Sequence, residues 1–158
     1  MNFKFYGLDG ELFSIYSQKS NAELEQMGAI KVIAGESFGY PCRVTLNDAA
    51  KGDELYLLNF AHLDNPQSPF AASHAIFVKK NAKTKHYEQN VVPPIVDNRE
   101  FLALRSFDHK DMMLGAVLTS GKSIAEAIHL QLQNQAVAKL HVHNAARGCY
   151  LAEVRPVR

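Results

Sequence analysis

The C-terminal part of the chain contains two strand-like segments joined by a short turn, and this pairing constrains the fold more than any other feature. Residues 139–143 alternate polar and apolar side chains, which is typical of a strand with one buried face. Gly148 and the small residues before it predict a reversing turn, and residues 149–155 follow as a returning strand. We therefore expect a hairpin that closes the fold.

The same hairpin gathers reactive side chains. Because one residue separates His141 from His143, both imidazoles point to the same face of an extended strand. With residues 144–148 as the loop, His143 is expected opposite Cys149, and His141 opposite Leu151. The sequence thus predicts a thiol and an imidazole side by side, with a second imidazole two residues away.

Short apolar or alternating segments recur through the rest of the chain and predict further strands. These segments are residues 2–6, 30–33, 42–46, 54–60, 73–78, 99–107 and 112–118. The pattern of residues 99–107 also fits a helix, and the turn that follows it favours a strand. Capping-box patterns that begin at Ser20 and Ser123 predict two helices, one over residues 21–27 and one from 123 to about 134.

The order of these elements indicates the fold class. Strands that run consecutively before the last helix favour an α+β fold with a mostly antiparallel, strongly curved sheet and about two helices. Residues 61–72, which include His62, are expected to form a loop, and a loop of that length in a compact domain is typically functional. With 158 residues, 47% of them hydrophobic and 21% charged, the chain suits a single compact domain spanning residues 1–158.

Charge and cysteine content exclude several classes of protein. The chain has 17 basic and 16 acidic side chains and a formal charge of +1, so no nucleic-acid partner is expected. No apolar run approaches the ~20 residues that a membrane-spanning helix needs, and the N-terminus lacks the pattern of an export signal. We therefore expect a cytoplasmic protein with no membrane partner, in which Cys42 and Cys149 are free thiols.

The first interpretation of the two histidines is metal binding. Neutral imidazoles two residues apart on a strand can chelate zinc, iron or nickel, with Cys149 or His74 as a third ligand. The pair resembles part of the cupin metal motif, but no matching glutamate follows at the usual short spacing and the flanking glycines are missing. A two-histidine pair is a weak motif by itself, so neither a metal nor another cofactor is expected.

The second interpretation is covalent catalysis. Cys149 would be the nucleophile, activated by His143, and Asn144 or the backbone amides of the turn would donate hydrogen bonds to a developing oxyanion. This arrangement depends on the length of the hairpin loop, because one bulged residue would turn the thiol to the other face of the strand. An inert buried cysteine is the structural alternative.

The third interpretation is anion recognition by arginine. Arg43, Arg105 and Arg147 lie between apolar or turn residues, and a guanidinium group binds carboxylate or phosphate through two parallel hydrogen bonds. Structural alternatives apply here too. The arginines can pair with a structural acid such as Asp108, and the histidines can be hydrogen-bonded to backbone in a purely structural cluster.

Several motifs occur in an order that resembles a known bacterial family. They are Gly39–Arg43, Leu57–Phe60, Ser68–Val78, Leu104–Asp108, and His141–Asn144 together with Gly148–Tyr150. Over nearly the whole chain they resemble the family known as domain of unknown function 1203. The resemblance implies a small, stand-alone cytoplasmic domain, and it implies no activity.

We expect the reactive side chains to converge in one pocket that binds a small anionic molecule. Its expected lining is Arg43, His74, His141, His143, Asn144 and Cys149, extended by Arg105 and Asp108. Within it, His143, Cys149 and His74 are the candidate catalytic residues and the others are candidate binding residues. The predicted function is a hydrolase or transferase that uses histidine as general acid or base. The alternatives are a non-catalytic domain that binds a metal or small ligand, and a purely structural cluster.

Overall fold

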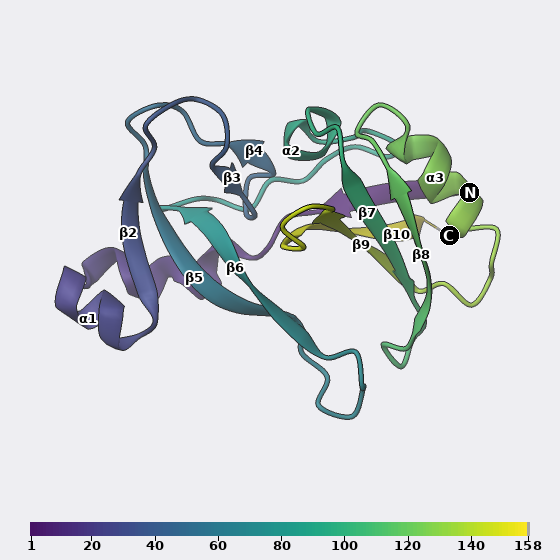
Figure 1. Ribbon diagram of the computed structural model, residues 1–158, viewed down its shortest axis with the longest axis horizontal. Coiled ribbons are helices and arrows are strands. Elements are labelled where there is room, and N and C mark those ends of the chain that lie inside the picture. Colours follow the sequence, from purple (N-terminus) through teal and green to yellow (C-terminus); the bar gives the residue numbers. More distant parts are fainter. Residues whose placement is uncertain (158) are drawn as a thin grey trace.

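The computed structural model describes residues 1–157, and in these residues ten strands form two five-stranded sheets (Figure 1). Sheet A consists, in spatial order, of β1 (Asn2–Tyr6), β10 (Tyr150–Val157), β9 (Lys139–Asn144), β7 (Leu102–Phe107) and β8 (Met113–Thr119). Sheet B consists of β2 (Ala29–Ile33), β5 (Glu54–Leu63), β6 (Ala72–Lys79), β3 (Pro41–Cys42) and β4 (Asn47–Asp48). Neighbouring strands are antiparallel except β3 and β6, which are parallel. The predicted α+β class is confirmed, and the strands divide between two sheets.

Four helical segments connect or cover the strands. They are the 3₁₀ helix η1 (Gly10–Gln18) and the α-helices α1 (Asn21–Gln26), α2 (Pro94–Asp97) and α3 (Ile124–Gln131). The capping box of α1 is confirmed, because Ser20 and Glu23 each accept a hydrogen bond from the other's backbone N–H. The capping box predicted for α3 is wrong: Ser123 has helical backbone angles and its side chain makes no capping hydrogen bond. The short helix α2 was not predicted, although Pro94 stands in its first turn, where proline is favoured.

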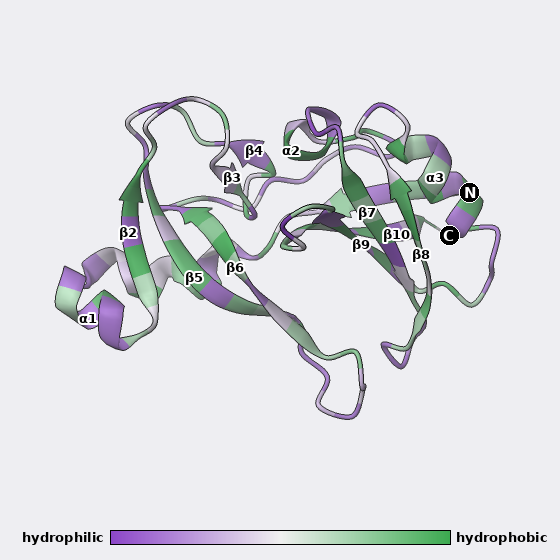
Figure 2. Cartoon of the chain, in the orientation of Figure 1, coloured by the Kyte–Doolittle hydropathy of each residue, from purple (hydrophilic) through white to green (hydrophobic). Residues whose placement is uncertain are grey.

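Each sheet buries its own apolar cluster. Phe3 and Phe5 of β1 pack with Leu104 of β7 and with Ile124 and Ile128 of α3, and all five side chains are fully buried. The cluster of sheet B is separate and includes residues of η1, α1, β5 and β6. Figure 2 shows hydrophobic and hydrophilic residues alternating along several strands, as expected for sheets that bury one face.

The strand predicted over residues 42–46 is wrong for most of its length. Only Pro41–Cys42 forms a strand, and residues 43–46 form a turn that ends with Leu46 at a φ of 54°. The carbonyl of Arg43 accepts a hydrogen bond from the N–H of Leu8 at 2.8 Å. Leu8 lies outside sheet B, so this carbonyl does not take part in the hydrogen bonding between the strands of the sheet. This turn places the Arg43 side chain between the sheets.

The two sheets meet where β5 and β6 extend past the end of the hairpin formed by β9 and β10 (Figure 1). Arg43 crosses this junction, because its Nε donates to the carbonyl of Tyr150 at 2.8 Å. A second link joins Arg99, next to α2, to Asp48 of β4 by two hydrogen bonds of 3.0 and 2.9 Å. None of the helices within residues 1–157 combines the length and apolar character needed to cross a membrane.

Candidate functional site

A bulge in β5 brings His62 into the junction. The predicted loop over residues 61–72 is wrong at both ends, because β5 runs to Leu63 and β6 begins at Ala72. Ala61 pairs with Ser73 and Leu63 pairs with Ala72, so His62 is an extra residue on β5 without an opposite neighbour. Such a bulge twists the strand and re-aims the side chain. His62 was therefore not predicted as a site residue, and the signal for it was the continued strand-like sequence after Phe60.

The C-terminal hairpin forms as predicted, but its register differs. His143 pairs with Tyr150, not Cys149, because the loop is one residue shorter than predicted. Asn144 belongs to the strand, and its N–H donates to the Cys149 carbonyl at 3.0 Å. Gly148, at a φ of 76°, supplies the left-handed conformation of this turn. Successive residues of a strand face opposite sides, so the slip of one residue separates the thiol from the face that carries His143.

A second bulge determines which side chain lies beside His141. Beyond Tyr150 the register shifts, and His141 pairs with Glu153, not with Leu151 as predicted. The shift places a carboxylate next to an imidazole, and Glu153 Oε2 lies 3.3 Å from His141 Nε2. Leu151 is the extra residue and is fully buried in the core of sheet A.

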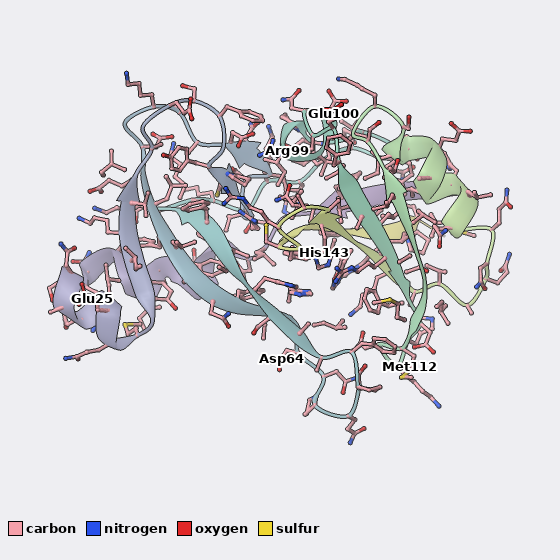
Figure 3. The ribbon with its side chains drawn as sticks, viewed as in Figure 1. Glu25, Asp64, Arg99, Glu100, Met112 and His143 are labelled. Carbon is pink, nitrogen blue, oxygen red and sulfur yellow. The ribbon has the colours of Figure 1, made fainter. Side chains whose placement is uncertain are left out.

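Four histidines meet at the junction, and we call them the histidine cluster: His62, His74, His141 and His143. The His62 ring stacks on His74 with a centroid separation of 4.8 Å, and it meets His141 and His143 edge-on at 5.3 and 5.1 Å. Tyr150 covers the other side of His62 at 4.9 Å. His143 lies between the two sheets in Figure 3, with other nitrogen-bearing side chains around it.

Hydrogen bonds assign the protons of two of these rings. His143 Nδ1 lies 2.9 Å from the Gly148 carbonyl, and His141 Nε2 faces the carboxylate of Glu153. A carbonyl and a carboxylate only accept hydrogen bonds, so both of these nitrogens carry the proton and donate. In the neutral form of each ring, the lone pairs are therefore on His141 Nδ1 and His143 Nε2. His143 Nε2 has no hydrogen-bond partner among the described residues, although its side chain is fully buried.

Burial favours the neutral form of His62, His74 and His143, because it lowers the pKa of each. Removal from water lowers the pKa of His62 to about 2 and that of His143 to about 3, and neighbouring positive charges act in the same direction. Burial and the nearby charges of Arg105 and Arg43 also lower the pKa of His74. A histidine with a pKa near 3 is a weak general base at neutral pH, which disfavours the catalytic role predicted for His143.

A pocket of about 630 Å³ opens beside the cluster. Its polar lining consists of Arg43, His74, Arg99, Glu100, Asn144, Arg147 and Cys149. Three aromatic side chains, Phe38, Phe77 and Phe101, contribute to its apolar wall. His74 is the member of the histidine cluster that also lines this pocket within the described part of the chain.

Arg43 lines the pocket from a buried position with only 2% of its surface exposed. Its Nη1 donates to the Pro41 carbonyl at 2.7 Å, and its Nη2 lies 3.4 Å from Cys149 Sγ. The side-chain amide of Asn144 also donates to this sulfur, at 3.0 Å. Arg43 therefore holds the backbone and the thiol in place. It does not offer a ligand two free, parallel N–H groups.

The remaining predicted residues lie at different places. Arg105 pairs with His141 across β7 and β9 and contributes positive charge to the cluster. Arg147 is exposed at the rim of the pocket. Asp108 accepts backbone hydrogen bonds from Lys110 and Met112 at 2.8 and 2.9 Å, so it shapes the turn before β8. The predicted single pocket is thus two adjoining sites, with Asp108 apart from both.

Fold and site define an α+β protein in which a partly buried histidine cluster adjoins an open, arginine-lined pocket. The chain belongs to the family described as "Protein of unknown function (DUF1203)", whose sequence model matches residues 39–156. The match confirms the resemblance seen in the sequence and includes all four histidines of the cluster. No curated protein and no solved structure shows a significant match to the chain.

Proposed function

We propose that this protein binds a small anionic organic molecule in the pocket and acts on it as a hydrolase or transferase. The observation that carries the proposal is the buried charge of Arg43. Its guanidinium group bonds to two carbonyls and a sulfur, and none of the ion pairs found within residues 1–157 joins it to a carboxylate. A buried cation without a counter-ion favours an anion at the adjoining surface of the pocket.

The rest of the lining suggests the chemical class of the ligand. Arg147 adds a second cation at the rim, whereas Arg99 is already paired with Asp48 and Glu100 contributes one opposing carboxylate. The aromatic wall favours a ligand with an apolar body, since small-molecule sites combine an apolar surface with few polar groups. An aromatic carboxylate or an aryl phosphate has both features.

Cys149 is the candidate nucleophile of this pocket. Its sulfur accepts N–H groups from Arg43 and Asn144, and its side chain is only partly buried. In a hydrolase reaction, Sγ would bond to the acyl carbon of an ester while the alcohol leaves with the thiol proton. Water would then cleave the thioester and regenerate the thiol. His74 replaces His143 as the candidate proton carrier, because His74 lines the pocket and is less buried than His143.

Binding of aromatic anions tests the pocket. Phenyl phosphate and benzoate are expected to bind more tightly than benzyl alcohol, which lacks the charge, and than inorganic phosphate, which lacks the ring. Arg147→Gln is expected to weaken binding of phenyl phosphate by about tenfold, the usual contribution of one charge-assisted hydrogen bond. Isothermal titration calorimetry measures both effects. Lys83→Gln, a matched loss of an exposed charge outside the pocket, is the control. Equal affinities for phenyl phosphate and benzyl alcohol would contradict the proposal.

Thiol labelling tests the role of Cys149. In the native protein, iodoacetamide is expected to modify Cys149 and to leave the fully buried Cys42 unmodified, whereas the unfolded chain reacts at both free thiols. Phenyl phosphate is expected to slow the reaction at Cys149, and mass spectrometry of the peptides measures both rates. If the bound anion leaves the labelling rate unchanged, Cys149 lies outside the binding site and the nucleophile assignment fails.

A further inference from the structure

Three members of the histidine cluster bring one ring nitrogen each close together. One ring nitrogen from each of His62, His141 and His143 lies within 4.8 Å of the others. The two Nδ1 atoms of His62 and His141 are only 3.2 Å apart. Tetrahedral coordination by imidazoles places neighbouring nitrogens about 3.3 Å apart, so this pair is already at ligand spacing. The wider separations close by a side-chain movement of about 1.5 Å at most.

The protons leave lone pairs on these nitrogens. Glu153 and the Gly148 carbonyl accept from the outer nitrogens of His141 and His143, so in the neutral form of each ring the inner nitrogen accepts or coordinates. One proton of His62 can satisfy His141 Nδ1, but His143 Nε2 then still lacks a donor among the described residues. A purely structural cluster gives this buried atom no partner, although buried ring nitrogens are normally hydrogen-bonded.

Each of the three rings also has a partner at its outer nitrogen, and for His141 and His143 it is of the kind that metal-binding histidines use. His141 has a carboxylate, His143 has a backbone carbonyl, and His62 Nε2 has His74 Nδ1 at 2.7 Å. Such partners fix the ring orientation and the tautomer of a ligand. When His62 donates its Nε2 proton to His74, its Nδ1 lone pair becomes available next to that of His141.

We propose that His62, His141 and His143 bind one divalent transition-metal ion, for which zinc is the best match. Imidazole nitrogen is a preferred ligand of zinc, and three protein ligands leave a fourth position for water or an anion, as in catalytic zinc sites. Cys149 is not a ligand, because its sulfur bonds to Arg43 and Asn144 outside the cluster. The proposal replaces the expectation of no metal and holds whether or not the pocket binds an anion.

Metal titration of the chelator-treated protein tests this site. One equivalent of Zn²⁺ is expected to bind and raise the melting temperature, and Co²⁺ is expected to give the visible absorption of a four-coordinate ion without a thiolate band. His62→Gln and His143→Ala are each expected to weaken Zn²⁺ binding by more than about 100-fold, beyond the effect of outer-partner changes. His62 lies at a half-exposed bulge, so its variant keeps the test valid if the buried His143 variant does not fold.

Three further variants show which side chains the metal affinity depends on. His109→Ala removes an exposed histidine, and Cys149→Ser removes the pocket thiol, so both are expected to bind Zn²⁺ like the wild type. Glu153→Gln is expected to weaken binding by about 10- to 100-fold through loss of the outer carboxylate. If His62→Gln binds Zn²⁺ as tightly as His109→Ala, the proposal is overturned. Failure of phenyl phosphate to bind would leave the metal result unaffected, so the two proposals fail independently.

Discussion

Gly121→Ala is expected to lower the free energy of unfolding by about 3 kcal/mol or more, because the structure has no room for a Cβ there. That atom would lie 2.2 Å from the carbonyl oxygen of Val96 and 2.4 Å from that of Asp97. Both contacts are backbone atoms of α2, so no side chain can rotate away. With about 2–4 °C per kcal/mol for a chain of this size, the melting temperature should fall by at least about 6 °C.

The matched control is a glycine with space around it. At Gly115 in β8 the nearest atoms to a new Cβ would be Ser106 Oγ at 3.6 Å and Gln131 Oε1 at 3.7 Å. Alanine there is expected to change stability by less than about 1 kcal/mol, since it also reduces the freedom of the unfolded chain. Differential scanning calorimetry of both variants measures the contrast. Equal melting temperatures would show that the backbone around Gly121 yields to the new side chain.

Arg43→Met is expected to lower the free energy of unfolding by about 2–4 kcal/mol. The change leaves the carbonyls of Tyr150 and Pro41 without their donors and removes the link between the sheets. The substitution also removes the desolvation cost of a buried charge. The expected loss of stability is therefore smaller than the sum of the broken hydrogen bonds. Urea denaturation at fixed pH measures the difference.

Arg147→Met provides the control for Arg43, because both arginines line the pocket but Arg147 is exposed. Its effect on stability is expected within about 0.5 kcal/mol, the usual range for surface substitutions. If Arg43→Met is as stable as Arg147→Met, the guanidinium group does not hold the junction. It would then be available for the two-pronged anion contact predicted from the sequence.

Local sequence patterns predicted much of the secondary structure. The opening strand at residues 2–6, the capping box at Ser20 and the C-terminal hairpin were all recognisable, because each depends on neighbours within a few residues. Helix α2 and the turn after Cys42 were not predicted, since contacts with distant segments determine them. The single-domain boundary, the cytoplasmic location and the absence of a nucleic-acid partner stay predictions.

The sequence by itself determined that His141 and His143 share one face of a strand, and it identified the family. Only the tertiary structure decided which side chains join them. A shorter hairpin loop and a bulge together place Glu153, not Leu151, opposite His141, and another bulge directs His62 toward a histidine 79 residues away. A bulge depends on hydrogen bonds between two strands, and here it places its side chain against a second sheet. Periodicity within one segment contains neither kind of information, so the pair was visible in the sequence and the cluster was not.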